Sequence, residues 1–209
     1  MSYRVVKRIL DICFSALALL VLLPLFVLIG LVVCLDSPGS PIFAQERAGQ
    51  HKKSIRVYKF RTMYRDTPEN VPTGERERPY DGITRVGRFL RRSSLDELPQ
   101  LFNILKGEMS FVGPRPLIWA ETEIIEARDR LGVYEVRPGL TGWAQVNGRD
   151  LVTAVQKEAL DAEYVRHMSF WFDVRCLRRT VKVVLCAEGF REGAGAPERT
   201  KAKQHERER

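Results

Sequence analysis

The sequence has 209 residues, of which 34 are Lys or Arg and 26 are Asp or Glu, and its formal net charge at pH 7 is +8. A chain of this length can bury a core without disulfides and predicts one domain. The mean hydropathy of −0.21 is typical of a soluble protein, but it averages one intensely apolar run with a charged remainder. This distribution excludes an ordinary cytosolic protein and a multi-span transporter.

The apolar run extends from Ile12 to Leu35 without a charged residue. As a helix that rises about 1.5 Å per residue, it is long enough for a hydrocarbon core of about 30 Å. The run is longer than the apolar part of a signal peptide, and no small-residue cleavage site accompanies it. We therefore expect residues 1–36 to form a membrane-embedded helix, with Arg8 at the lipid headgroups.

The direction in which this helix leaves the membrane is open from its residues alone. Basic residues before the run predict a cytoplasmic N-terminus, and a straight helix would then carry the rest of the chain across the membrane. Pro24, however, lies at the middle of the run, and proline kinks a helix because it removes a backbone hydrogen bond and clashes with the preceding turn. A kinked helix could return to the cytoplasmic face, so both a re-entrant and a spanning helix are compatible with the sequence.

The remainder predicts a mainly helical domain over residues 37–190 with one short β-hairpin. Strand-like runs at 42–44 and 55–60 are separated by a turn-rich segment, which favours the hairpin. A polar stretch, 64–82, predicts a long loop. Three segments have helical patterns, namely 98–106, 117–130 and 170–187.

Two further segments carry a prediction about the surroundings of the domain. Residues 83–92 mix apolar and basic side chains, which is typical either of an interfacial amphipathic helix on anionic lipid or of a solvated basic face. Trp171 and Phe172 could likewise lie at the membrane interface or pack on the core. Residues 191–209 form a polar, basic tail that we expect to be disordered.

Asp96 and Glu97 are adjacent carboxylates, and they allow two interpretations. Ser94 with Glu97 three residues later is a capping-box pattern, so the carboxylates could simply cap a helix. The pair also lies close to four arginines at positions 85, 88, 91 and 92. In that setting it could bind a divalent cation and leave one carboxylate free to attack phosphorus.

Two more motifs suit phosphate or another polar ligand. Arg115 lies between Pro114 and Pro116, which fix its backbone, and a guanidinium pairs with phosphate in a fork. A rigid turn with a solvated arginine is the alternative. Residues 137–149 combine three glycines, two arginines, two amides and an indole, which suits either a ligand-binding or a structural loop. The sequence contains no nucleotide-binding P-loop, dinucleotide fingerprint or zinc motif.

Together these motifs resemble the bacterial sugar transferases, the small monotopic phosphoglycosyl transferases. The resemblance extends from about Arg4 to Leu185. It rests on six segments in order: Lys7–Asp11, Phe43–Gly49, Tyr58–Met63, Ser94–Gln100, Val112–Pro116 and Arg137–Trp143.

The resemblance implies a reaction. Such enzymes transfer a phospho-sugar from a UDP-sugar to a polyprenol (undecaprenyl) phosphate, release UMP, and initiate the assembly of capsule, O-antigen, exopolysaccharide or glycoprotein. They use Mg²⁺ and a covalent phosphosugar–aspartate intermediate. The resemblance assigns the nucleophile, and a place beside the metal, to Asp96. It assigns an assisting role to Glu97, by deprotonation of the polyprenol phosphate.

The remaining candidates are polar residues expected to bind substrate. They are Lys59, Arg61, Arg91, Arg115, Arg137, Gln145, Asn147, Arg149 and Asp161. The expected partners are the UDP-sugar, the polyprenol phosphate, lipid of the cytoplasmic leaflet and, as an option, a second copy of the chain in a homo-oligomer. Nucleic acid is not expected, because acidic residues are interspersed among the basic ones.

The resemblance also implies a topology. A catalytic domain on the cytoplasmic face of the bacterial inner membrane favours the re-entrant helix, because Asp96 must meet cytoplasmic substrates. The family often has Ser-Pro at the kink, whereas this chain has Leu23-Pro24, so no serine hydroxyl can bond a freed carbonyl there. A membrane-anchored basic binding or scaffold module without catalysis is the alternative function.

Overall fold

The computed structural model describes residues 3–67, 82–148 and 153–185. The described part is mainly helical, with one antiparallel and one parallel pair of strands. Short 3₁₀ turns occupy Gln50–Lys52, Leu95–Glu97 and Val133–Glu135. The strands are β1 (Ile42–Ala48), β2 (Ser54–Phe60), β3 (Ser110–Val112) and β4 (Gly139–Thr141). The helices are α1 (Tyr3–Asp36), α2 (Arg85–Ser93), α3 (Gln100–Lys106), α4 (Thr122–Arg130), α5 (Trp143–Val146), α6 (Ala154–His167) and α7 (Phe170–Leu185).

The predicted hairpin is confirmed, and β1 and β2 pair in antiparallel register from Ile42 opposite Phe60 to Ala48 opposite Ser54. The helical segments are also confirmed, although the predicted helix over 117–130 begins only at Thr122. The segment before it is held by the hairpin instead, since the carbonyl of Leu117 accepts from the amide of Ala48 at 2.9 Å and its side chain packs beside Ala48. Most of the predicted loop and all of the predicted tail lie outside the described residues.

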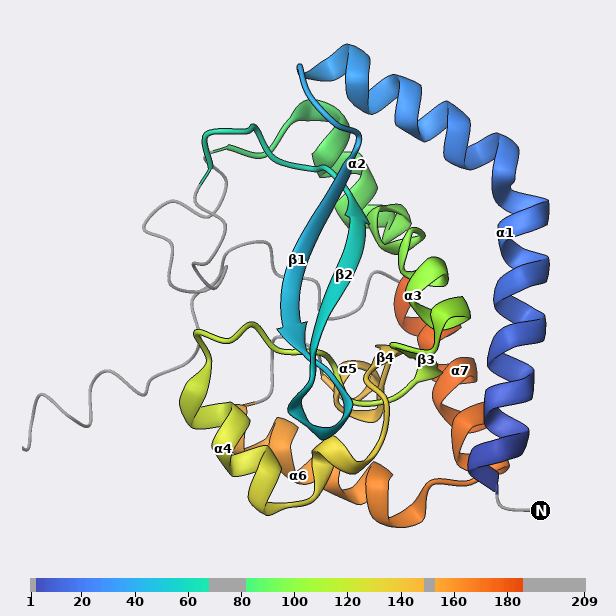
Figure 1. Cartoon of the computed structure of the whole chain (residues 1–209), viewed down its shortest axis with the longest axis vertical. Coiled ribbons are helices and arrows are strands. Elements are labelled where there is room, and N and C mark those ends of the chain that lie inside the picture. The colour runs from blue at the N-terminus through green and yellow to red at the C-terminus, as the bar shows by residue number, and fades with distance from the viewer. Residues whose placement is uncertain (1–2, 68–81, 149–152, 186–209) are drawn as a thin grey trace, which may run out of the picture.

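Helix α1 runs along one side of the domain and bends part-way along its length, with Pro24 as the proline inside it (Figure 1). Among the described helices it alone is long and apolar enough to cross a membrane. Many of its apolar side chains face outward; Leu20 is 72% exposed and Leu35 86% exposed. Such a surface is unfavourable in water, so the outer face of α1 belongs in lipid, and we describe the chain as a membrane protein.

The inner face of α1 packs on the domain at helical spacing. Leu22 and Phe26 join a core formed by β2 and α3, and Ile29 and Val33 contact Phe60. A second core lies between β3, α5, α6 and α7, where Phe172 packs edge-on against Trp143 at a centroid distance of 4.8 Å. This contact confirms core packing for Phe172, while its neighbour Trp171 is 76% exposed.

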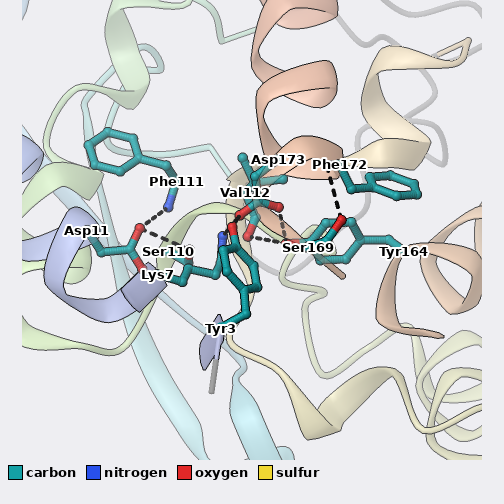
Figure 2. Close-up of polar contacts among 10 residues, drawn as sticks. All are labelled: Tyr3, Lys7, Asp11, Ser110, Phe111, Val112, Tyr164, Ser169, Phe172 and Asp173. Atoms are coloured by element: carbon teal, nitrogen blue, oxygen red, sulfur yellow. Dashed lines mark hydrogen bonds and ion pairs between the residues drawn. The ribbon is translucent and has the colours of Figure 1, made fainter. Parts of the chain in front are cut away.

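Polar contacts tie the N-terminal part of α1 to the domain (Figure 2). Asp173 of α7 is 7% exposed, and its carboxylate accepts from Tyr3 at 2.5 Å and pairs with Lys7. Tyr164 of α6 lies 2.7 Å from the same carboxylate. One turn further along α1, Asp11 accepts from the hydroxyl of Ser110 at 3.1 Å and from a backbone amide of β3.

The C-terminal end of α1 is attached to the same domain. The carboxylate of Asp36 accepts from the amide of Val86 at 3.1 Å. Arg61, predicted to bind substrate, instead donates to the carbonyls of Pro38 and Ser37 at 2.6 Å, just beyond this helix end. The buried guanidinium therefore satisfies carbonyls that lack a helical partner, and both ends of α1 are held by one body.

The parallel pair of β3 and β4, which the sequence did not predict, brings two motifs together. The amide of Gly113 donates to Thr141 at 2.9 Å, and the amide of Gly139 donates to Pro114 at 2.9 Å. A Cβ on Gly139 would lie 2.1 Å from the nitrogen of Gly113, so only glycine allows this approach. The Pro-Arg-Pro segment is thereby fixed beside the glycine-rich segment that begins at Arg137.

We expect Asp173→Ala to destabilise the protein by about 3–5 kcal/mol, because the charge of Lys7 and the hydroxyl of Tyr164 would stay buried without their acceptor. Thermal unfolding in detergent measures the effect.

The matched control is Asp129→Ala. Asp129 pairs with Lys52 on the surface, where both side chains are more than 40% exposed, so the loss should stay below about 1 kcal/mol. Equal losses of stability in the two variants would contradict a special contribution of the Asp173 contacts to stability.

Candidate active site

The two carboxylates lie in the 3₁₀ turn Leu95–Glu97, between α2 and α3. Ser94, which precedes the turn, has a left-handed backbone with φ of 58°, and its side chain makes no capping hydrogen bond. Glu97 does not return to Ser94 but accepts a hydrogen bond from Lys59. The capping-box interpretation is therefore wrong, and the carboxylate of Glu97 points toward β2 of the hairpin.

Glu97 lies between two cations. Lys59 of β2 donates to its Oε1 atom at 2.6 Å, and the guanidinium of Arg115 lies 3.9 Å from the same oxygen. The side chains of Lys59 and Glu97 are about one-fifth exposed, whereas that of Arg115 is 46% exposed. Arg115 is thus anchored beside Glu97 and still presents its guanidinium to solvent.

The electrostatics separate the two carboxylates. Burial raises the pKa of Asp96, which is 8% exposed, and the charge of Glu97 raises it further, while Lys59, Arg91 and Arg115 act in the opposite direction. Burial also acts to raise the pKa of Glu97, but Lys59 and Arg115 outweigh it, and the pKa falls below its ordinary value. Glu97 is consequently the more acidic carboxyl of the pair.

An open pocket of about 230 Å³ lies beside the turn, and Glu97, but not Asp96, is among the residues that line it. Its charged lining consists of Arg47, Lys59, Glu97 and Arg115, so cations outnumber carboxylates. Gln100, which is 3% exposed, also lines it. Neither Arg47 nor Gln100 was predicted as a site residue, although both fall within motifs that carried the resemblance.

Asp161 does not line the pocket and affects it only through Arg128. It forms a buried ion pair with Arg128 of α4, and Arg128 donates to the backbone carbonyl of Arg115 at 2.8 Å. Burial raises the pKa of Asp161 to about 6, against the opposing charge of Arg128. The pair therefore supports the position of Arg115, a role that no local sequence pattern around Arg128 could have indicated.

Other predicted residues are engaged elsewhere. Arg8 donates to the carbonyls of Ile104 and Leu105 at 2.6 and 2.8 Å, and Arg137 donates to that of Gly107 at 2.8 Å. These two arginines cap the C-terminal end of α3, where the helix dipole favours positive charge.

The predicted amide residues follow α4 and β4 in the chain and lie around α5. Asn147 bonds to the carbonyl of Trp143 at 2.7 Å and accepts from Arg179, so it joins α5 to α7. Gln145 lies 3.5 Å from the carbonyl of Leu140, a residue of the pocket wall.

Arg91 bonds to Thr62 at 2.9 Å, and its charge lowers the pKa of Asp96. Arg149 lies outside the described residues.

The side chains near the pocket decide whether it could hold the predicted Mg²⁺. Within the described residues no group of three or more His, Cys, Asp or Glu side chains gathers to hold a metal. Mg²⁺ is commonly bound by one or two carboxylates together with water and substrate phosphate, rather than by an all-protein cage. Asp96, with Glu97 beside it, fits that mode.

Comparison with known proteins identifies the group to which this architecture belongs. Residues 2–187 match the family described as bacterial sugar transferase. The chain belongs to the bacterial sugar transferase family. The match includes α1, the hairpin, the Asp96–Glu97 pair and the Pro-Arg-Pro segment, so the features that form the pocket lie inside the shared region.

Three relatives illustrate the range of this bacterial sugar transferase family. The chain is 42% identical over 191 residues to an undecaprenyl-phosphate glucose phosphotransferase of Komagataeibacter xylinus, covering 84% of this chain but 35% of the relative. It is 40% identical to a UDP-glucose:undecaprenyl-phosphate glucose-1-phosphate transferase of Caulobacter vibrioides, covering 87% and 70%. It is 40% identical to an uncharacterized sugar transferase, EpsL, of Bacillus subtilis, covering 90% and 91%. The chain therefore spans about a third of the first relative's length.

We expect Arg128→Leu to destabilise the protein by about 3–5 kcal/mol at pH 8, because it strands the charge of Asp161. Since burial already raises the pKa of Asp161 and the variant removes the opposing cation, the carboxyl should be neutral at pH 5, and the loss should be smaller there. Unfolding midpoints at both pH values test this.

Arg128→Leu combined with Asp161→Leu is the matched control, because it removes both charges and should recover most of the stability lost at pH 8. An equal loss at the two pH values, or no recovery in the double variant, would contradict the assignment.

Proposed function

We propose that this protein transfers a sugar phosphate from a UDP-sugar to undecaprenyl phosphate and releases UMP, as the first step of glycoconjugate assembly. The observation that carries the proposal is the pocket lined by Glu97, Lys59 and Arg115, with Asp96 next to Glu97 and within the electrostatic influence of the same two cations. An excess of cations suits a diphosphate donor, and an available carboxylate suits attack on phosphorus. Two relatives are named for transfer of this kind with glucose.

The transfer proceeds by two displacements at one phosphorus atom. A carboxylate oxygen of Asp96 attacks the β-phosphorus of the UDP-sugar, the bond from that phosphorus to the bridging oxygen breaks, and UMP leaves with the electron pair. The phosphate oxygen of the polyprenol then attacks the same phosphorus and releases the Asp96 carboxylate. A covalent step avoids bringing two anionic substrates together at once.

Glu97 is better suited to align the cations than to abstract a proton. Its pKa is lowered, chiefly by Lys59 and Arg115 acting against burial, and a carboxylate with a low pKa is a weak base. It bonds to Lys59 at 2.6 Å and holds Arg115 at 3.9 Å, so its charge keeps both cations at the edge of the pocket. We therefore assign Glu97 a positioning role, in place of the deprotonation suggested by the resemblance.

Mg²⁺ belongs to this proposal as a cofactor that Asp96 would hold together with the phosphate of the substrate. When bound, it would supply neutralisation of phosphate charge. In this proposal Lys59, Arg91 and Arg115 also neutralise phosphate charge. The same three residues orient the substrate phosphates.

We propose that α1 is re-entrant and that the domain lies on the cytoplasmic face of the inner membrane. Support comes from both ends of α1, because the end near Lys7 pairs with Asp173 and the end at Asp36 bonds to Val86. A straight spanning helix would separate these ends by about the thickness of the hydrocarbon core. The exposed Trp171 and Phe89, at 76% and 64%, suit contact of α7 and α2 with the lipid interface.

We expect Asp96→Asn to lower UMP release by at least about 10³-fold, because the amide cannot act as the nucleophile. The assay supplies undecaprenyl phosphate, Mg²⁺ and a panel of UDP-sugars that begins with UDP-glucose. Asp129→Asn, on the surface, is the matched control and should retain wild-type activity. Near wild-type UMP release from Asp96→Asn would refute the mechanism.

Single cysteines at the two ends of α1 test the topology. In a cysteine-free background, Arg4→Cys and Ser40→Cys occupy exposed positions that flank the apolar run. We expect a membrane-impermeant maleimide to label both from the cytoplasmic side alone. Labelling of the two positions from opposite sides would establish a spanning helix instead.

A further inference from the structure

Arg47 lies on the same face of the hairpin as Lys59. In the antiparallel register, Lys59 is opposite Phe43. Alternate side chains of a strand point to the same face, and Phe43 and Arg47 are four residues apart in β1. Arg47 therefore projects toward the pocket, as its place in the pocket lining requires.

Two hydrogen bonds orient the guanidinium of Arg47. It donates to the carbonyl of Pro116 at 2.9 Å and to the side-chain oxygen of Gln45 at 2.7 Å. Both acceptors are neutral, so these bonds fix the direction of the group without neutralising its charge. A guanidinium held in this way loses little entropy when it binds a further partner.

The charge of Arg47 is costly in the absence of an anion. Burial and, to a lesser extent, the nearby charge of Arg115 lower its pKa to about 10, because the carboxylates of Glu121 and Glu97 only partly compensate. The residue is still a cation at neutral pH. Two guanidiniums near one another in a partly buried pocket repel each other. An anion that lies between them offsets this repulsion and accepts hydrogen bonds from both.

We propose that Arg47 and Arg115 together bind the phosphoryl oxygens of a substrate, which makes Arg47 a phosphate-binding residue of the transfer reaction. The inference rests on the proposed function and adds to it one residue from β1. Oxygen atoms of a phosphate accept a forked pair of N–H donors, and a pocket with three cations and one carboxylate attracts such a group. The phosphate belongs either to the diphosphate of the donor or to the polyprenol acceptor.

A purely structural role for Arg47 makes a different prediction. Its bond to Pro116 could serve only to hold the Pro-Arg-Pro segment, and its loss would then impair every ligand of the pocket alike. A phosphate contact instead affects ligands according to their phosphate groups. Comparison of UDP with uridine, as inhibitors of UMP release, separates the two roles.

The test uses Arg47→Gln with Arg56→Gln as the matched control, since Arg56 is exposed on the opposite face of the same hairpin. Inhibition constants for UDP and uridine, and KM values for the UDP-sugar and undecaprenyl phosphate, are measured for each. We expect Arg47→Gln to raise one phosphate-bearing KM by about 10- to 100-fold, with uridine inhibition unchanged. Arg56→Gln should match the wild type.

The pattern of losses identifies the source of the phosphate. Weaker UDP inhibition with a higher KM for the UDP-sugar assigns Arg47 to the donor, and a higher KM for undecaprenyl phosphate alone assigns it to the acceptor. Unchanged constants for all phosphate-bearing ligands, or an equal loss for UDP and uridine, would overturn the proposal.

Arg47→Lys keeps the test decisive if Arg47→Gln fails to fold. Lysine keeps the charge but cannot form the fork, so we expect an intermediate loss of roughly 3- to 10-fold for the same ligand. Wild-type constants in Arg47→Lys would contradict the forked contact. Absence of UMP release by the wild-type protein would remove the proposed function itself, whereas UMP release without any dependence on Arg47 would remove only this assignment.

Discussion

The hydrogen bond from Lys59 to Glu97, 2.6 Å long, lies at the centre of the charge balance of the pocket. Two adjacent carboxylates in a half-buried turn repel one another, and cations from other elements must offset this cost. Lys59 comes from β2 and Arg115 from the segment after β3, so the pair is stable only when the hairpin and the β3–β4 pair are in place. The pKa of Glu97 is lowered as a result, whereas that of Asp96, which lies beside the pocket, is raised by burial and by the charge of Glu97.

A second set of contacts fixes the position of the carboxylate pair relative to α1. Arg8 of α1 and Arg137 both bond to carbonyls at the end of α3, the helix that follows the carboxylate pair. Arg61 closes the other end of α1. Arg8 and Arg61, which the sequence suggested for headgroup and substrate binding, therefore join α1 to α3 and to the end of β2. The pocket is therefore held in a fixed position relative to the apolar helix α1.

The sequence predicted the elements well and their contacts less completely. The hairpin, the apolar helix and the acid pair follow from periodicity and composition, which are local properties. The β3–β4 pair was missed because its strands have three residues each and gain their stability from the close approach of Gly113 and Gly139. The packed face of α1 could not be read because the run is apolar on all sides. Arg47, Arg61 and Arg128 are all basic residues, and only the fold decides whether each faces a phosphate, a carbonyl or a carboxylate.

The most direct test of the account is a single-turnover experiment without acceptor lipid. The wild-type protein is mixed with Mg²⁺ and the UDP-sugar it accepts, and UMP is measured together with the mass of the intact protein. The account predicts a burst of UMP approaching one equivalent per protein molecule and an added sugar phosphate on the peptide that contains Asp96, discharged when undecaprenyl phosphate is supplied. UMP release that requires the acceptor from the first turnover, with no modified peptide, would contradict a covalent intermediate on Asp96.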